Sequence, residues 1–390
     1  MDSIGWVGRE LGALEEASLL RSPAIIDSMS GPEVSIEGRR LILACSNNYL
    51  GLAGDERVIE AARSAASRFG AGSGASPLVS GLTRAQRDLE ERLAAFKGTE
   101  DCVIFSSGYL ANIGVIQALA GPDDAVFSDE LNHASIIDGC RLSRATPVIY
   151  RHADMEHLDS LLSEGGFRRS LVVTDSVFSM DGDVAPLTEL VEIARRHGAM
   201  TVVDEAHATG VLGPAGGGAV EALGLTGQVD AVVGTMSKAL GSAGGFVAGT
   251  SDLAAWLRNR ARSQIFDTAP VPAAIGAASA AIEVIASEPV RRERIAELRA
   301  LLTEGLRDLG YRVGESESAI IPVFVGESDE AMRLSARIRQ SGVFAPAIRP
   351  PSVPVGTARI RLTVMATHSD MQIAQVLDAF AAARGDGSAP

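Results

Sequence analysis

The segment GTMSKALGSAGG, residues 234–245, contains a single lysine, Lys238, between an apolar run and a glycine-rich turn. The run before it, residues 230–235, is typical of a short strand, so we expect Lys238 just beyond a strand end. Strand ends are where α/β sheets carry ligand-binding and catalytic side chains. The small neighbours Ser237 and Ala239 would let a bulky group reach the ammonium. Lys238 is therefore a candidate to form a Schiff base, although an ordinary loop lysine would also fit this segment alone.

A second segment, TVVDEAHATGVLG at residues 201–213, places an acid and an imidazole after another strand-like run. Asp204 ends the run, and His207 follows three residues later. Pyridoxal phosphate needs these residue types, because a carboxylate keeps its pyridine nitrogen protonated and a donor binds its phenolic oxygen. A metal site or an ordinary ion pair is the alternative, but no third ligand lies nearby at metal-binding spacing. We therefore interpret Asp204 and His207 as part of a cofactor site without a metal.

Together, DEAHATGVLG and GTMSKALGSAGG resemble the α-oxoamine synthases, a family of fold-type I enzymes that use pyridoxal phosphate, and the resemblance covers nearly the whole chain. It implies an α/β fold, in which a large domain with a mostly parallel sheet flanked by helices is followed by a smaller C-terminal α/β domain. We expect an N-terminal arm and small segment at residues 1–48, the large cofactor-binding domain at 49–284 and the C-terminal domain at 285–390. A helical pattern that begins near residue 285 supports the last boundary.

Composition and charge favour a globular protein that acts on small molecules. The chain has 390 residues, of which 46% are hydrophobic and 22% charged, which is enough for a large buried core. The net charge of −14 argues against binding nucleic acid or an anionic membrane over the whole surface. The N-terminus does not read as a signal peptide, and no apolar run is long enough to span a membrane, so we expect a cytoplasmic protein. The cysteines Cys45, Cys102 and Cys140 form no CxxC motif and are expected to be free thiols.

The segment DCVIFSSGYLANIGVIQAL, residues 101–119, is typical of a strand that turns into a helix at Ser107 and Gly108. Free backbone amides and the helix dipole at such a start favour a phosphate dianion. Ser107, Gly108 and Tyr109 are therefore predicted to hold the cofactor phosphate, as the same motif does in the family. An ordinary helix-capping serine explains the local sequence equally well.

Further cofactor contacts follow from the resemblance alone. It implies that His133, in FSDELNHASIIDG, stacks on one face of the pyridine ring, and that Ser179, in SVFSMDGD, lies at the phenolic edge. It also implies cofactor contacts for Thr235, at the end of the strand before Lys238, and for Thr268, in a loop that crosses to a second subunit. The family therefore predicts a homodimer with shared active sites.

A glycine-rich segment, GAGSGASPLVSG at residues 70–81, matches the dinucleotide-binding pattern G-x-G-x-x-A. That pattern needs a strand immediately upstream, whereas residues 57–69 are alanine-rich and are predicted to be helical, so we reject a nicotinamide site. The segment is similar to the family's glycine-rich loop that admits the acyl chain. Glycines that merely turn the chain are the alternative.

Candidate residues for the amino-acid substrate come from three parts of the chain. An alternating strand at residues 357–364 puts Arg359 and Arg361 on one polar face. An RIRLT-like motif binds the amino-acid carboxylate in the family, which makes Arg361 the predicted carboxylate anchor, since a guanidinium can bind it through two hydrogen bonds. Arg359 is left unassigned, with a solvent-facing strand edge as the alternative. By resemblance, Asn47 in ACSNNYLGL lies close to the cofactor, and it is predicted to bind substrate together with Arg21, at the end of an N-terminal helix.

The segment AIRPPSVPVGTAR, residues 347–359, separates the branches of the family. Arg349 before two prolines resembles the branch that makes 8-amino-7-oxononanoate, whereas the glycine-using branches tend to have an aromatic residue before one proline. This chain has Ser352 where that branch usually has threonine, which retains the hydroxyl. Arg349 and Ser352 are therefore predicted to bind the acyl substrate. A role for Arg349 in holding the loop is the alternative.

The resemblance implies the decarboxylative condensation of L-alanine with a pimeloyl thioester of CoA or a carrier protein, a step of biotin biosynthesis. Lys238 would hold pyridoxal phosphate and take the α-proton of alanine, while Asp204 keeps the ring protonated and His133 and His207 assist. The alternatives are another α-oxoamine synthase of the glycine C-acetyltransferase type, a fold-type I aminotransferase and a non-catalytic pyridoxal-phosphate-binding protein.

Overall fold

The computed structural model describes residues 4–384, which form two compact units. The large unit consists of residues 47–179 and 183–296, and the small unit of the described residues up to Ser46, residues 180–182 and those from Glu297 onward. The N-terminal segment therefore belongs to the same unit as the C-terminal part of the chain. Residues 180–182, which interrupt the large unit in sequence, also belong to the small unit, because Ser316 and Ser318 donate hydrogen bonds to the carbonyl of Gly182 at 2.9 and 3.0 Å.

A seven-stranded sheet in the order β3-β9-β8-β7-β6-β4-β5 forms the centre of the large unit. Only β9 runs antiparallel to its neighbours, β3 and β8, and the other pairs are parallel. All but the edge strand β5 are buried along nearly their whole length, as expected for strands covered by helices on both faces. The strands are β3 (Asp101–Phe105), β4 (Ala125–Asp129), β5 (Thr146–Tyr150), β6 (Ser170–Asp175), β7 (Met200–Asp204), β8 (Ala231–Thr235) and β9 (Gly245–Gly249).

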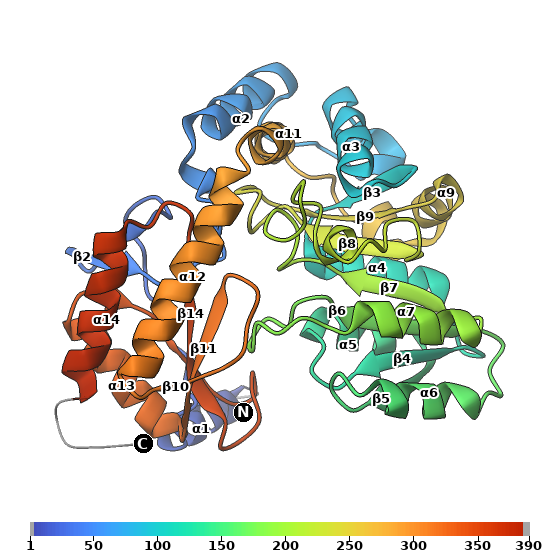
Figure 1. Ribbon diagram of the computed structural model, residues 1–390. Helices are drawn as coiled ribbons and strands as arrows, with labels where there is room; N and C mark the ends of the chain where they lie inside the picture. Colours follow the sequence, from blue (N-terminus) through green and yellow to red (C-terminus); the bar gives the residue numbers. More distant parts are fainter. Residues whose placement is uncertain (1–3, 385–390) are drawn as a thin grey trace. The chain divides into compact units, whose positions relative to one another are not determined.

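Helices cover both faces of this sheet, as the fold-type I resemblance predicted, which confirms the fold class. The connections from β3 through β4 to β5 run across the sheet in one direction, and those from β5 through β6 to β7 run back in the other. Because such connections are right-handed, α4 and α5 lie on one face of the sheet and α6 and α7 on the other (Figure 1). The helices of this unit are α2 (Glu56–Phe69), α3 (Arg84–Lys97), α4 (Gly108–Leu119), α5 (Ala134–Ser143), α6 (Met155–Ser163), α7 (Leu187–Arg196), α8 (Ala219–Ala222), α9 (Ser251–Arg260), α10 (Arg262–Ile265) and α11 (Pro272–Ser287), with short helical turns at Leu52–Gly54 and Pro77–Gly81.

The main hydrophobic core of the large unit lies between the sheet and helices α4, α5 and α9. It contains Val115 and Ile116 from α4, Val173 from β6 and Leu257 from α9, all fully buried. The alanine-rich α11 packs against α2, where a Cβ on Gly276 would lie 2.5 Å from the carbonyl oxygen of Ala61. Close backbone approach of this kind needs small residues. The small side chains of α11 thus serve helix packing inside the unit.

No single helix of the described chain is long and apolar enough to cross a membrane. The consecutive helices α11 and α12 (Val290–Asp308) meet the length and composition requirements only as a bent pair.

The small unit contains two sheets. A three-stranded sheet has the order β1-β2-β12, in which β1 and β2 form a hairpin that turns at Glu37 and Gly38, and a four-stranded antiparallel sheet has the order β10-β11-β14-β13. The remaining elements of the chain are α1 (Gly5–Glu16), β1 (Glu33–Ile36), β2 (Arg39–Leu43), α12, which begins in the large unit, β10 (Arg312–Val313), β11 (Ile320–Gly326), α13 (Ser328–Gln340), β12 (Val343–Phe344), β13 (Ala347–Ile348), β14 (Ala358–Thr363) and α14 (Asp370–Arg384).

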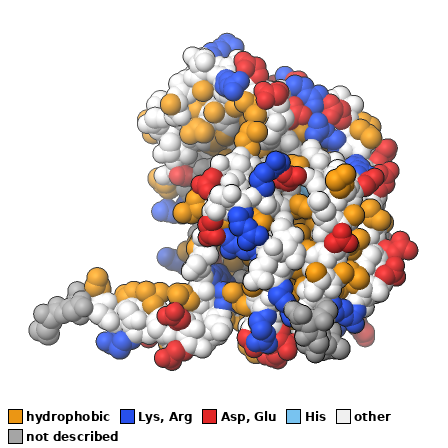
Figure 2. All heavy atoms as spheres, turned by 90° about the vertical axis from the view of Figure 1, so that its left-hand side faces the viewer, with side chains coloured by type: hydrophobic (Ala, Val, Ile, Leu, Met, Phe, Trp, Pro, Cys, Tyr) orange, Lys and Arg blue, Asp and Glu red, His pale blue; other side chains and the backbone are white. Residues whose placement is uncertain are grey.

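The N-terminal helix expected before Arg21 forms as α1, which ends at Glu16, and none of its residues is buried. Hydrophobic side chains line its surface (Figure 2), and Trp6, Leu11 and Leu14 are 56, 47 and 41% exposed. The apolar face of α1 is thus available to pack against another surface.

Candidate functional site

Five parallel strands of the large unit end at the same edge of the sheet, and each is followed by a predicted site residue. The carboxyl ends of parallel strands lie side by side, which is why ligand sites form there. In sheet order, β3 leads to Ser107, β8 to Lys238, β7 to Asp204, β6 to Ser179 and β4 to His133. Topology alone therefore gathers residues that lie up to about a third of the chain apart in sequence.

Lys238 lies in the turn between the antiparallel strands β8 and β9 and is partly buried. Its Nζ is 3.0 Å from Nε2 of His207. The turn is closed by a hydrogen bond from the amide of Gly241 to the carbonyl of Lys238, at 2.9 Å. Gly241 has φ +58°, and a Cβ there would lie 2.3 Å from the amide nitrogen of Ala53. The glycines around Lys238 therefore allow a tight turn as well as the access that the sequence suggested.

His207 is held from its other side by a buried polar chain. Its Nδ1 lies 2.7 Å from the hydroxyl of Tyr49, and that hydroxyl donates to Oδ1 of Asn47 at 3.0 Å. With the hydroxyl proton directed to Asn47, Nδ1 of His207 carries a proton and donates to Tyr49, which leaves Nε2 as the acceptor facing the Lys238 ammonium. Asn47 thus reaches the site through Tyr49, whose role the sequence analysis missed.

Asp204 is buried, with 5% of its surface exposed, at the end of β7. One carboxylate oxygen accepts a hydrogen bond of 2.6 Å from Nδ2 of Asn112, and the other accepts one of 2.7 Å from the amide of Ala206. Asn112 lies on α4 and also donates to Ser135 on α5, at 2.9 Å. A polar residue in the middle of the apolar segment GYLANIGVIQAL was the signal that could have identified Asn112 from the sequence.

His133 caps the N-terminus of α5, with its Nδ1 2.7 Å from the hydroxyl of Ser135. Its amide donates to the buried carboxylate of Asp175, the last residue of β6, at 2.7 Å. Burial lowers the pKa of His133; the charge of Asp204 opposes this shift, and that of Lys238 adds to it. Burial, followed by the neighbouring charge of Asp204, raises the pKa of Asp175 well above its usual range. The four groups therefore share one electrostatic environment.

The start of α4 has the geometry predicted for an anion site. Ser107 is the N-cap, and its Oγ accepts a hydrogen bond from the amide of Leu110 at 3.1 Å. A Cβ on Gly108 would lie 3.1 Å from Cβ of Thr235, so the helix start approaches the end of β8 closely. The first amides of a helix have no acceptor within the helix, which leaves them for a ligand. The Tyr109 ring makes an edge contact with His133, with ring centroids 6.4 Å apart, so these residues adjoin the rest of the site.

Thr268 and Ser179 lie in loops of the large unit. Thr268 is exposed, and its amide donates to the carboxylate of Asp267 at 2.9 Å. Asp267 in turn pairs with the hydroxyl of Ser106, next to the α4 N-cap. Ser179 is partly buried in the loop after β6.

The predicted substrate residues Arg21, Arg349, Ser352 and Arg361 all belong to the small unit. The structure brings three of them together, because Arg21 donates to the hydroxyl of Ser352 at 3.0 Å and Arg349 donates to the carbonyl of Leu20 at 3.0 Å. These contacts join residues 20–21 to the loop after β13. The hydrogen bond from Arg349 to Leu20 fits the alternative in which Arg349 holds its loop in place.

The polar face of β14 is buried, so the solvent-facing alternative for Arg359 is wrong. Arg359 and Arg361 are only 4 and 7% exposed. Arg359 forms an ion pair with Asp181, and its guanidinium lies 4.8 Å from the ring centroid of Phe324. Asp181, in the segment 180–182, supplies that carboxylate. Alternation along β14 shows which residues share a face, but it could not predict this partner.

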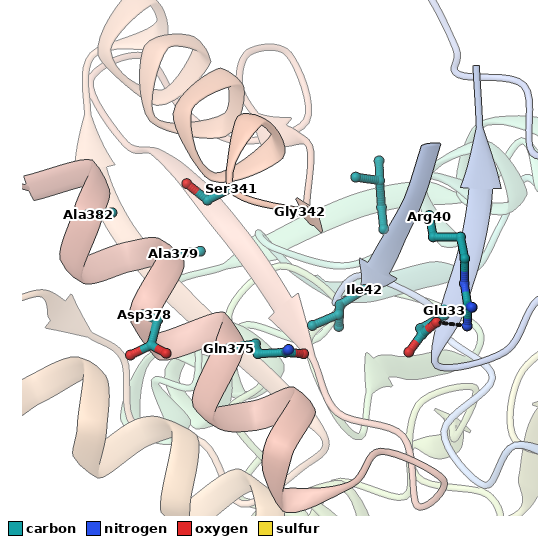
Figure 3. Close-up of a pocket in the computed structure, with 10 residues that line it drawn as sticks. Glu33, Arg40, Ile42, Ser341, Gly342, Gln375, Asp378, Ala379 and Ala382 are labelled. Atoms are coloured by element: carbon teal, nitrogen blue, oxygen red, sulfur yellow. Dashed lines mark hydrogen bonds and ion pairs between the residues drawn. The ribbon is translucent and has the colours of Figure 1, made fainter. Parts of the chain in front are cut away.

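A groove of about 490 Å³ in the small unit lies apart from these residues (Figure 3). It is formed by the β1–β2 hairpin, the end of α13 and one side of α14, and Glu33 at its edge pairs with Arg40. None of the candidate residues lines it. Among the residues from 4 to 384, no group of three or more histidine, cysteine or acidic side chains is arranged to hold a metal ion.

The donor set of the large unit fits pyridoxal phosphate. It offers an amine at Lys238, a buried carboxylate at Asp204, an imidazole at His133 and a helix start at Gly108. These are the groups that the cofactor's aldehyde, ring nitrogen, ring face and phosphate require.

Known proteins resemble this chain over nearly its whole length. The aminotransferase class I and II family matches residues 39–380. Curated relatives named 8-amino-7-oxononanoate synthase include one from Anaeromyxobacter dehalogenans, 52% identical over 98% of this chain and 96% of its own length, and one from Geobacter sulfurreducens, 47% identical over 96 and 97%.

Solved structures are similar over the same length. Sphingomonas wittichii serine palmitoyltransferase is 36% identical, with a TM-score of 0.94 over 98% of both chains, and S. paucimobilis serine palmitoyltransferase with bound PLP and myriocin has a TM-score of 0.93 over 97% of both. An 8-amino-7-oxononanoate synthase from Francisella tularensis is 26% identical, with a TM-score of 0.77 over 87% of this chain and 97% of its own.

Proposed function

Because the chain belongs to the class I and II aminotransferase family and, within it, to the 8-amino-7-oxononanoate synthases, we propose that it condenses L-alanine with a pimeloyl thioester. The products are 8-amino-7-oxononanoate, CO₂ and the free thiol of CoA or of a carrier protein. The protein is a pyridoxal-phosphate-dependent acyltransferase of biotin biosynthesis. The observation that carries the proposal is the 3.0 Å approach of Lys238 Nζ to His207 Nε2, beside the buried Asp204.

The bound pyridoxal phosphate supplies an electron sink that makes the α-carbon of alanine acidic and then nucleophilic. Lys238 would hold the cofactor through Nζ, and the same nitrogen, as a free amine, would take the α-proton of alanine and later return one. His207 accepts a hydrogen bond from Nζ and so orients the amine. Asp204, fixed by Asn112, would pair with the ring nitrogen and favour its protonated form.

The remaining cofactor contacts divide between ring and phosphate. His133, held in place by Ser135, would cover one face of the ring, and Ser179 would contact its phenolic edge. Ser107, Gly108 and Tyr109 bind the phosphate at the start of α4. Thr235, packed on Gly108, completes that cradle.

Substrate binding falls to the small unit and to Asn47. Arg361 binds the carboxylate of alanine through two parallel hydrogen bonds, for which its buried position on β14 removes competing water. Arg349, Arg21 and Ser352 shape the acyl site, with Arg349 acting mainly by holding the N-terminal segment through Leu20. Asn47 contributes next to the cofactor by accepting the hydrogen bond from Tyr49, which contacts His207.

The protein acts as a cytoplasmic homodimer in which Thr268 contributes to the phosphate site of the second copy. Two observations support this assembly. The apolar side of α1 is exposed, and Leu78, Val79 and Phe266, in the loops that precede α3 and Thr268, are 69, 77 and 69% exposed. Apolar groups exposed in this number are typical of a surface that another subunit covers.

The experiment that tests the function measures thiol release by the purified, cofactor-loaded protein. L-alanine, glycine and L-serine are each combined with pimeloyl-, acetyl-, succinyl- and palmitoyl-CoA. We expect alanine with pimeloyl-CoA to exceed each other pair by at least roughly a hundredfold in kcat/KM. Faster turnover of glycine with acetyl-CoA would assign the glycine C-acetyltransferase reaction instead, and faster turnover of serine with palmitoyl-CoA would assign that of the structural neighbours. Keto-acid formation without thiol release would indicate an aminotransferase, and neither product a non-catalytic cofactor-binding protein.

A further inference from the structure

A buried lysine outside the proposed catalytic set lies beneath the active-site turn. Lys97 is the last residue of α3, and its side chain is 2% exposed. Its ammonium donates to Oε2 of Glu205 at 2.5 Å, to Oγ1 of Thr209 at 2.7 Å and to the carbonyl of Gly217 at 2.6 Å. An ammonium has three protons, so each has an acceptor. Lys97 is therefore fully engaged inside the large unit.

The partner carboxylate is equally constrained. Glu205 is completely buried, and its second oxygen accepts a hydrogen bond from the amide of Val220, at the start of α8, at 2.7 Å. A Cβ on Gly218, which has φ +121°, would lie 2.2 Å from Oε2 of Glu205. Gly218 thus leaves room for the carboxylate, and the ion pair joins the end of α3, the turn after β7 and the start of α8.

The position of Glu205 in the chain gives this pair its importance. Glu205 directly follows Asp204 and precedes His207 by two residues. Its amide donates to the carbonyl of Val233 on β8 at 2.8 Å, and its carbonyl accepts from the amide of Thr209 at 2.8 Å. Lys97 therefore contacts both the first and the last residue of the hydrogen-bonded turn from Glu205 to Thr209, which carries His207.

We propose that the Lys97–Glu205 ion pair positions Asp204 and His207 relative to Lys238, which makes Lys97 a positioning residue of the active site. The Lys97 ammonium binds the two ends of the turn, at Glu205 and Thr209. The turn thereby fixes the His207 imidazole, whose Nε2 lies 3.0 Å from Nζ of Lys238. The pair has no net charge, so its effect on the site is exerted through geometry. This inference rests on the roles proposed above for Asp204 and His207.

The test uses variants of the full, cofactor-loaded protein. Lys97→Met removes the ammonium but leaves a buried carboxylate without its partner, which destabilises proteins and can prevent folding. The double variant Lys97→Met/Glu205→Gln is neutral at both positions. It therefore removes the unpaired charge of Glu205 but does not restore the hydrogen bonds that the Lys97 ammonium makes. Arg258→Met is the matched control, because it breaks the ion pairs of Arg258 with Asp101 (2.7 Å), the first residue of β3 and so at the opposite edge of the sheet, and with Glu90 (3.1 Å) of α3.

Three readouts separate positioning from stability. They are the thermal midpoint, the pH midpoint of the visible absorbance of the loaded enzyme, and the ¹⁵N chemical shifts of His207 in the unloaded protein. We expect the double variant to regain most of the thermal stability lost by Lys97→Met, yet to keep a displaced pH midpoint and altered His207 shifts. Its kcat falls by about tenfold or more, while KM for alanine changes by less than about threefold, because misplacement of catalytic groups affects the chemical step most.

Each outcome decides the inference. Arg258→Met should lower the thermal midpoint and leave the absorbance titration and His207 shifts as in the wild type. If the double variant recovers its thermal midpoint, titration and His207 shifts together, Lys97 supports the fold alone and the positioning role is overturned. Failure of the wild-type protein to develop the visible absorbance would overturn the proposed function instead, so the two failures are distinguishable.

Discussion

We propose Lys238 as the residue on which the chemistry depends. In Lys238→Ala the amine is lost, while the proposed phosphate and ring contacts, made by other strands, remain. We expect covalent attachment and turnover to disappear and non-covalent binding of pyridoxal phosphate to persist. Mass spectrometry after borohydride reduction, with equilibrium dialysis for binding, measures both. Retention of a reducible adduct in this variant would show that another lysine carries the cofactor.

His152 should link stability to pH on the alkaline side. Its ring nitrogens lie 3.0 Å from Asp129 and 2.9 Å from Asp183, which ties the end of β4 to the loop before α7. Burial alone would lower the pKa of His152, but the hydrogen bonds to the two carboxylates outweigh it and raise the pKa to about 10. A raised pKa stabilises the folded state fully below about pH 6.5. That contribution is then lost as the pH rises towards 10.

We therefore predict that the difference in thermal midpoint between the wild type and His152→Asn is largest at pH 6 and falls by more than half at pH 10. Differential scanning fluorimetry across this range measures the difference. A difference that stays constant with pH would mean that the imidazolium charge contributes nothing and that only the shape of the ring matters.

At the level of the element, the turn from β8 to β9 depends on Gly241. An alanine there would combine the strain of positive φ with a backbone clash at Ala53. Gly224 also has positive φ, +68°, but a Cβ there meets nothing within 4 Å. Strain alone costs about 1–2 kcal/mol for an alanine. We expect Gly241→Ala to lower the thermal midpoint well beyond Gly224→Ala and, unlike that control, to reduce cofactor attachment at Lys238; equal effects would contradict the clash.

Elements with a strong local signal could be predicted from the sequence. Apolar runs followed by a polar residue identified the strand ends at Asp204 and Thr235, and hydrophobic spacing predicted α1 and α12. The buried state of Arg359 could not be predicted, because alternation assigns a strand's faces but does not reveal that Asp181, far away in sequence, covers one of them. Asn112 and Tyr49 escaped for the same reason: their partners, Asp204 and His207, lie more than ninety residues away in the chain.

For the whole molecule, the shared active site can be tested by mixing inactive subunits. Lys238→Ala and Thr268→Ala homodimers each carry a defect in both sites. A mixed dimer would have one site with both defects and one with neither. Activity should therefore reappear on mixing and subunit exchange, towards about a quarter of the wild-type value at equal amounts if half of the dimers are mixed. Activity that never rises, although native mass spectrometry detects mixed dimers, would rule out a contribution of Thr268 to the second subunit's site.

The edge strand β3 pairs only with β9, and Phe105 at its end lies opposite Gly245. During synthesis on the ribosome, β3 emerges long before its partner, so the strand that leads into the phosphate-binding helix must wait unpaired while most of the large unit is translated. Pairing over so long a stretch of chain is slow and leaves a strand edge open to association with other nascent chains. Since β9 also closes the turn that carries Lys238, the proposed anchoring amine and the proposed phosphate site become neighbours in the same late step. We therefore expect a nascent chain that ends before β9 to bind no pyridoxal phosphate.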